Sequence, residues 1–310
     1  HHEPIFLHGL GEQPMIQFLS QYEGITVDKR VIVDSRHKGQ DQEGSGTIYI
    51  DGVTKATVSV LVMNDTVLSA ALQVARAYLE GFERPPMVTV RDDIFQPYSW
   101  QQLETKGLLR PWNVSKDQLQ ERFPLALEDY QDAELQQALA ESDLPGRYYY
   151  AYLNTPVTGK NLLGEADFAR LKAALRPGEH ALLVVSAGDY GFLEPGFHRG
   201  TVPGRLGMSQ NGLPVDIRDL DFFDNSQPHL PADAPAFNEI RVFRIKAQSG
   251  FDPSQPMTLN LDLDLPRNHL VRDQAQLEDS YQLPVDLFDI KVIEEIKPLP
   301  LWQRLWLDRW

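Results

Sequence analysis

The apolar and polar positions of the first third of the chain predict a small unit of helices and strands. Residues 14–24 have the spacing of a short helix that ends at Gly24, and residues 25–33 alternate as a strand does. The run "TIYIDGVTKATVSVLVM" (47–63) predicts a hairpin around Asp51 and Gly52. A second helix follows over 66–81, with Asn64 or Asp65 as its N-cap.

The later part of the chain has a different pattern. Short strand-like runs alternate with clusters of Gly, Pro and Asn, which is typical of an antiparallel sandwich. The predicted strands are 147–154, 180–188, 238–248 and 257–265, and a helix is expected over 166–175. In the last strand the leucines alternate with Asn260, Asp262 and Asp264, so this polar side should face water. Further helices are expected to begin at Ser99 and Asp132.

These patterns together give an α+β fold class. A mixed α+β domain over 1–125 precedes a mainly antiparallel, sandwich-like β domain with added helices over 126–290. The remaining residues, 291–310, form a connector in which Trp302, Trp306 and Trp310 lie on one helix face. This aromatic face fits either a juxtamembrane segment or a terminal helix that docks on the body.

Composition excludes several classes of function. The net charge of -15 repels polyanions, so no nucleic-acid partner is expected. The chain has no cysteine, which excludes disulfides, thiolate catalysis and iron–sulfur ligation by these residues. Glycine-rich phosphate loops, zinc-protease histidine pairs and nucleophile elbows are also absent from the sequence. We therefore assign no catalytic residue and no metal ligand.

An acidic run near residue 220 raises the question of calcium. It contains Asp216, Asp219, Asp221 and Asp224 but lacks the spacing and the central glycine of an EF-hand loop. A solvated strand edge explains the same residues more simply.

The most informative stretch is "DGVTKAT", which runs from Asp51 to Thr57. It resembles the flavinylation motif Asp-x-x-Ser/Thr-Gly-Ala-Ser/Thr, with Lys55 in place of the usual glycine. In proteins with that motif a flavin transferase joins FMN through its phosphate to the last hydroxyl. The resemblance implies that Thr57 carries covalent FMN and that Asp51, Thr54 and Ala56 shape the turn for the transferase. Lys55, at the position of the glycine, is counted with them as a cofactor-binding residue.

Six stretches, one of which contains this motif, occur in the order seen in the NosR/NirI family, which this chain resembles over nearly its whole length. They are "HHEPIFLHGL", "DGVTKATVSVLVMNDTVLSAALQVAR", "SWQQLETKGLL", "GDYGFLEPGFHRG", "FRIKAQSGFDPSQP" and "LPLWQRLWLDRW". The resemblance makes 1–125 an FMN-binding domain, 126–290 an accessory domain and 291–310 a juxtamembrane connector. It also implies that a loop containing His2, Glu3, Pro4 and Ile5 approaches the flavin.

In that family the flavin domain is periplasmic and is tethered to the inner membrane by the C-terminal continuation. The resemblance therefore implies an electron-transfer flavoprotein module, rather than an enzyme with its own substrate, that supports nitrous oxide reductase or its maturation factors. Two alternatives remain open: a flavin-free periplasmic sensor or docking module, and the nitrite-reductase-linked NirI paralogue. Lys55 motivates the first of these.

Overall fold

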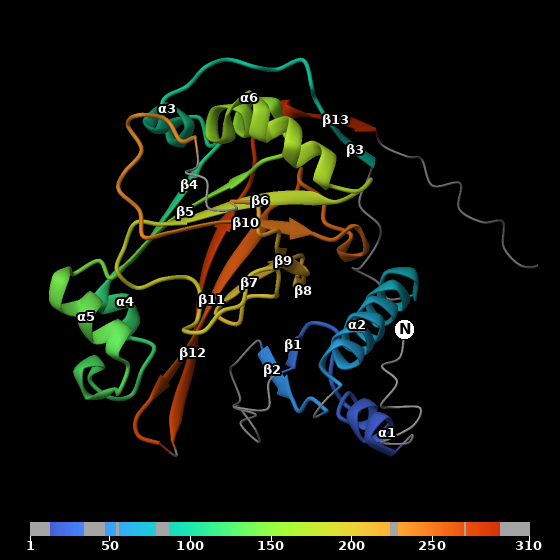
Figure 1. The fold of residues 1–310 in the computed structure, drawn as a ribbon, viewed down its shortest axis with the longest axis vertical. Helices are drawn as coiled ribbons and strands as arrows, with labels where there is room; N and C mark the ends of the chain where they lie inside the picture. The colour runs from blue at the N-terminus through green and yellow to red at the C-terminus, as the bar shows by residue number, and fades with distance from the viewer. Residues whose placement is uncertain are drawn as a thin grey trace, which may run out of the picture.

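The computed structural model describes residues 13–33, 47–53, 56–78, 87–223, 229–269 and 271–291 (Figure 1). The α-helices among these residues are α1 Gln13–Ser20, α2 Thr57–Tyr78, α3 Trp100–Thr105, α4 Lys116–Gln120, α5 Ala133–Glu141 and α6 Pro156–Ala174. Short 3₁₀ turns are η3 Leu127–Asp129, η4 Ala247–Ser249 and η5 Val285–Leu287. The strands are β1 Arg30–Val33, β2 Thr47–Ile50, β3 Met87–Val90, β4 Arg110–Val114, β5 Gly146–Tyr152, β6 His180–Ser186, β7 Leu206–Gln210, β8 Leu213–Pro214, β9 Ile217–Asp219, β10 Glu239–Ile245, β11 Met257–Pro266, β12 Arg272–Tyr281 and β13 Phe288–Lys291.

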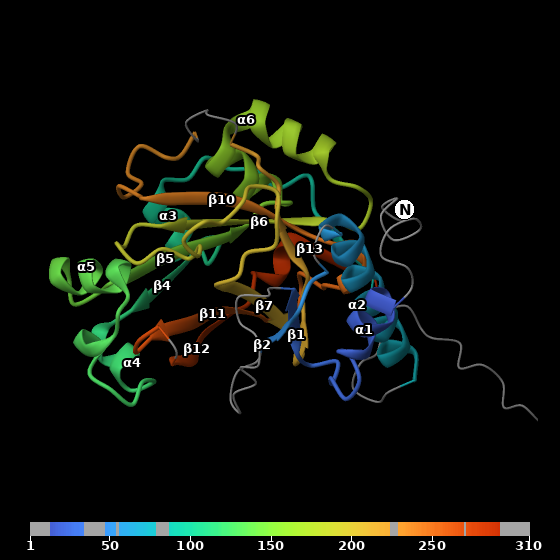
Figure 2. The ribbon, with the colours of Figure 1, turned by 60° about the horizontal axis from the view of Figure 1, so that its bottom comes forward.

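Two antiparallel sheets form the larger unit. One has the strand order β4-β5-β6-β10-β9 and the other the order β12-β11-β7-β8. Figure 2 shows α6 on the outer side of the first sheet and the second sheet on its opposite side. The predicted α+β class and its sandwich-like second part are therefore confirmed.

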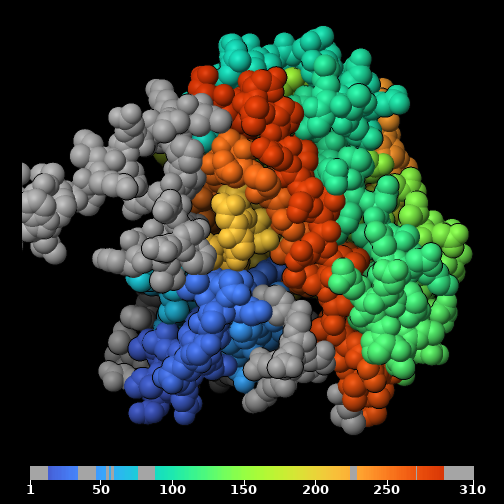
Figure 3. Space-filling view, turned by 180° about the vertical axis from the view of Figure 1, so that it is seen from behind, coloured from blue at the N-terminus to red at the C-terminus, as the bar shows by residue number. Residues whose placement is uncertain are grey.

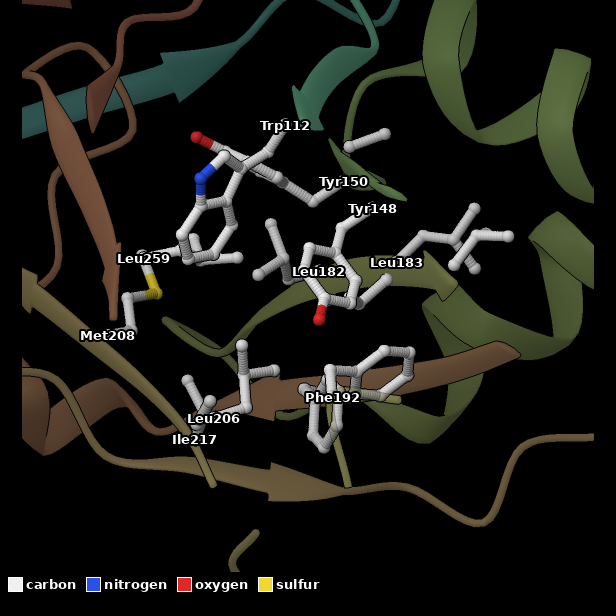
Figure 4. Close-up of a cluster of buried hydrophobic side chains, with 14 of the residues drawn as sticks. Trp112, Tyr148, Tyr150, Leu182, Leu183, Phe192, Leu206, Met208, Ile217 and Leu259 are labelled. Atoms are coloured by element: carbon white, nitrogen blue, oxygen red, sulfur yellow. The ribbon is translucent and has the colours of Figure 1, made fainter. Parts of the chain in front are cut away.

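The core of this unit is filled by side chains from both sheets (Figure 4). Tyr148 and Leu182 from the five-stranded sheet belong to one buried cluster with Met208 and Leu259 from the four-stranded sheet. All four are at most 1% exposed. Burial of this much aromatic and aliphatic surface is the main favourable contribution to folding.

The first unit is smaller and has its own core. Strands β1 and β2 pair in parallel, and α1 and α2 pack on them through a second cluster. Its buried members are Phe18, Val31, Ile50, Ala56 and Val60.

Two predictions for this unit are wrong. Residues 57–63 are not the second strand of a hairpin, because they form the first two turns of the 22-residue helix α2. Asn64 and Asp65 consequently lie inside α2 and do not cap it. Asn64 instead accepts a hydrogen bond of 2.7 Å from the Tyr22 hydroxyl, which joins α2 to the end of α1.

The division between the two hydrophobic cores falls early in the chain. Trp100, Leu109 and Trp112, which precede the predicted domain boundary at 125, belong to the larger core. Strand β3 pairs with β13, the last described strand, so this connecting region is also tied to the second unit.

The polar side of β11 is predicted to face water, but the first unit covers part of it. The Asp262 side chain is only 11% exposed, because Arg30 and Thr47 of the first unit cover it. A second contact joins Asp65 of α2 to Lys246 at 2.8 Å, just beyond β10. In Figure 3 the blue atoms of the first unit accordingly adjoin the yellow and red atoms of the larger one.

The acidic run near residue 220 is distributed over different contacts. Asp216 pairs with Lys246, Asp221 pairs with Arg199, and Asp219 accepts the Gly200 N–H at 2.9 Å. Asp219 is only 4% exposed, so a solvated strand edge is the wrong interpretation for this residue. Asp224 lies outside the described residues. Within the described ranges, no group of three or more acidic, His or Cys side chains could hold a metal ion.

A buried histidine of the larger unit should make stability depend on pH. His180 Nδ1 lies 2.7 Å from the Tyr152 hydroxyl and its ring packs against Phe251. Burial lowers the pKa of His180 from 6.5 to about 4, so the unfolded chain takes up a proton before the folded one does. The stability contributed by neutral His180 is complete above pH 6.5 and is lost as the pH falls toward 4, with about 2 kcal/mol lost between pH 7 and 5.

Urea unfolding at pH 7 and pH 5 measures this loss. The pH dependence should flatten in His180→Gln, which does not titrate, and should persist in His198→Gln, which removes an exposed histidine. Equal pH dependence in the wild type and in His180→Gln would contradict the prediction.

Candidate functional site

The candidate site is the segment from Asp51 to Thr57, which joins β2 to α2. Ala56 is fully buried in the smaller core, and its N–H donates to the Val53 carbonyl at 3.1 Å. The Ala56 carbonyl accepts the N–H of Val60 at 3.0 Å, which begins the helical hydrogen-bond pattern. Thr57 is therefore the first residue of α2.

This position has a favourable electrostatic environment for an anion. The first N–H groups of a helix lack partners within the helix, and the aligned peptide dipoles place a partial positive charge there. The first turn of α2 has no acidic residue that would oppose this charge. A phosphate bound at the N-terminus of α2 would be stabilised in the same way as phosphates at other helix N-termini.

The start of the segment is fixed by Gln21, which follows α1. The Gln21 Oε1 atom accepts the Asp51 N–H at 2.7 Å, and Nε2 donates to the Asp51 carbonyl at 3.0 Å. Nε2 also lies 3.4 Å from the Phe18 carbonyl of α1. Both backbone groups of the first motif residue are thus satisfied by one side chain.

The structure brings part of the predicted set together. The backbones of Asp51, Ala56 and Thr57 lie in one short connection. Thr54 and Lys55 lie outside the described residues, as do His2, Glu3, Pro4 and Ile5 of the predicted flavin loop. Trp302, Trp306 and Trp310 are also outside them, so both interpretations of the Trp-rich end stay predictions.

The hydroxyls near the segment have different environments. The Thr47 hydroxyl donates to Asp262 Oδ2 at 2.9 Å, and Ser59 is only 2% exposed. A flavin transferase must be able to reach the hydroxyl that it modifies, so neither of these two hydroxyls suits the attachment.

Sequence reasoning missed the residues that support the segment from outside the motif. Gln21 is 30 positions from Asp51, and the Asp65 pair with Lys246 spans 181 positions. No local pattern marks such long-range partners. The only signal was that Gln21 and Tyr22 lie near the end of the helix predicted over 14–24 and could face its neighbour.

An open groove of about 460 Å³ lies beside Gln21, the residue that holds Asp51. It is lined by the turn after α1 and by β2, including Gln21, Lys29, Ile48 and Tyr49. Its volume is within the range of small-molecule sites, although its walls are more polar than most.

Comparison with known proteins identifies the family. The chain is 34% identical over its whole length to the regulatory protein NosR of Stutzerimonas stutzeri and 31% identical to NosR of Pseudomonas aeruginosa. It is 28% identical, over 99% of its length, to the protein NirI of Paracoccus denitrificans. The chain belongs to the NosR/NirI family.

The relatives are longer than this chain, which spans 43% and 44% of the two NosR proteins and 41% of NirI. No protein-family profile matches the sequence. No solved structure matches it either. Within the described residues, no helix has the length and hydropathy needed to cross a membrane.

Proposed function

We propose that this chain is the flavin-bearing module of a NosR-type protein, with FMN joined through its phosphate to the Thr57 hydroxyl. The observation that carries the proposal is that Thr57, the last residue of the flavinylation-like motif, begins α2. The motif thereby ends where a helix offers its positive end to a phosphate.

The residues around the segment suit such a group. No acidic side chain in the first turn of α2 would repel a phosphodiester. Buried Ala56 anchors the backbone just before the attachment residue, and Gln21 anchors it at Asp51. When bound, FMN would supply one- or two-electron redox chemistry, while the protein's part is to hold and orient it.

Attachment requires a donor with an activated phosphate, such as FAD. In this transfer the Thr57 oxygen forms a bond to the FMN phosphorus and the pyrophosphate bond of FAD breaks. AMP leaves with the bonding electrons, and the hydroxyl proton passes to a base of the transferase. No electron is gained or lost by the flavin, so attachment needs no oxidant.

Family membership supports a wider role. The NosR relatives are named as regulatory proteins, and we propose that this chain serves the expression or maturation of nitrous oxide reductase. A periplasmic position, tethered to the inner membrane by a C-terminal continuation, is part of the same proposal. The similarity to NirI makes a link with nitrite reductase the second candidate.

Mass spectrometry tests the proposed attachment. After co-expression with a flavin transferase, the intact protein should gain the mass of one FMN less one water, and fragmentation should locate it on Thr57. The purified protein should also be yellow. An unmodified, colourless chain under these conditions would exclude the flavin module and favour the docking alternative.

A further inference from the structure

Gln21 forms an unusually complete contact with the first residue of the motif. Its side-chain amide accepts from the Asp51 N–H at 2.7 Å and donates to the Asp51 carbonyl at 3.0 Å. A neighbouring strand would satisfy the same two backbone groups in this way. The last paired residues of the parallel ladder are Val33 and Ile50, so Gln21 continues the pairing by one residue where the ladder ends.

We propose that Gln21 is a positioning residue for flavin attachment, which it assists by fixing the backbone of Asp51 at the start of the motif. This inference rests on the proposed function. Gln21 acts through Asp51 and the segment that follows it, without itself contacting the reacting atoms.

The segment is then held at both of its ends. Gln21 fixes Asp51, while Ala56 is fully buried and begins the hydrogen bonds of α2. Only residues 52–55 lie between these two fixed points. The attachment hydroxyl follows directly after the second of them.

A fixed segment matters because group transfer depends on the alignment of the reacting atoms. The transferase must bring one hydroxyl in line with one phosphorus atom, and a displacement of about 1 Å can slow such a step by about a hundredfold. A segment whose two ends are already fixed also loses less conformational entropy when the transferase binds it.

The contact requires an amide specifically. A glutamine has both an N–H donor and a carbonyl acceptor, and the Asp51 backbone presents one of each. A glutamate could accept from the Asp51 N–H, but it would place a carboxylate oxygen against the Asp51 carbonyl. A methionine would fill the same space with neither hydrogen bond.

The test is the rate of FMN incorporation into purified, flavin-free protein with purified flavin transferase and FAD. Gln21→Met should lower kcat/KM about tenfold, since two hydrogen bonds are lost, and Gln21→Glu should also lower it. Hydrogen exchange at the Asp51 amide should accelerate in Gln21→Met. Gln17→Ala is the matched control, because Gln17 is an exposed glutamine of α1, the helix that directly precedes Gln21.

The outcomes separate this inference from the function on which it rests. If Gln21→Met and Gln21→Glu incorporate FMN at the wild-type rate well below their unfolding temperatures, Gln21 has no positioning role. A role in stability alone would lower those temperatures and leave kcat/KM unchanged. If the wild type takes up no FMN, the proposed function fails first and the positioning role fails with it.

Discussion

Thr57→Ala should yield a folded protein that carries no covalent flavin. The substitution removes the hydroxyl that would form the phosphodiester, and the proposed attachment has no substitute for it. Modification should fall from nearly complete to undetectable in protein co-expressed with a flavin transferase. Intact mass and flavin fluorescence of the denatured protein measure this directly.

Two variants make the result specific. Thr57→Ser keeps a hydroxyl at the first position of α2 and should still be modified, as the Ser/Thr alternative of the motif implies. Thr66→Ala removes an exposed hydroxyl from the same helix and should retain full modification. Persistence of the adduct in Thr57→Ala would show that another residue carries the flavin.

The sequence was most informative where the signals are local. The helix expected from Ser99 has a complete capping box between Ser99 and Gln102, and Asp132 caps α5 by accepting the Leu135 N–H. These helix ends were predictable because a cap and its partner lie within three residues. Four strands of the sandwich, β5, β6, β10 and β11, were also predictable, and β11 shows the signal most plainly because it buries every second residue.

The mistaken prediction of a hairpin over 47–63 shows where the periodicity of apolar residues fails as a guide. Residues 57–63 are almost all apolar or β-branched, so both a strand and a helix can bury some of them. The helix prevails because Ala56 and Val60 are buried together against the two-stranded sheet. Gly52 also has no left-handed backbone, unlike Gly24, so "DG" does not form the hairpin turn that it suggested.

The candidate site could be predicted only as a motif. The order of Asp51, Ala56 and Thr57 is visible in the sequence, but the helix that begins at Thr57 and the contact from Gln21 are not. Alternation along β11 likewise identified its polar side. It could not show that an arginine more than 200 positions earlier would cover that side, because tertiary contacts leave no local pattern.

Asp262→Ala should release the first unit from the sandwich and destabilise the protein by about 3 kcal/mol. Asp262 Oδ2 accepts from Arg30 Nη1 and from the Thr47 hydroxyl, each at 2.9 Å. These are the first residues of β1 and β2 and are paired in the ladder, so one carboxylate holds both strands. Its other oxygen accepts from Gln276 at 2.7 Å. Removing the carboxylate leaves a guanidinium that is only 14% exposed without its charge partner.

Hydrogen exchange of β1 and β2, measured beside urea unfolding, distinguishes release of the first unit from general destabilisation. Asp264→Ala is the matched control, because Asp264 is on the same strand and pairs with Arg272 within the sandwich. It should weaken the β11–β12 hairpin without exposing β1 or β2. In a double-mutant cycle, the losses of unfolding free energy caused by Asp262→Ala and Arg30→Ala should be strongly non-additive. Arg30→Ala removes the guanidinium charge that Asp262→Ala leaves without its partner. Additive losses of stability in the cycle, or unchanged hydrogen exchange of β1 and β2 in Asp262→Ala, would show that this ion pair does not hold the first unit in place.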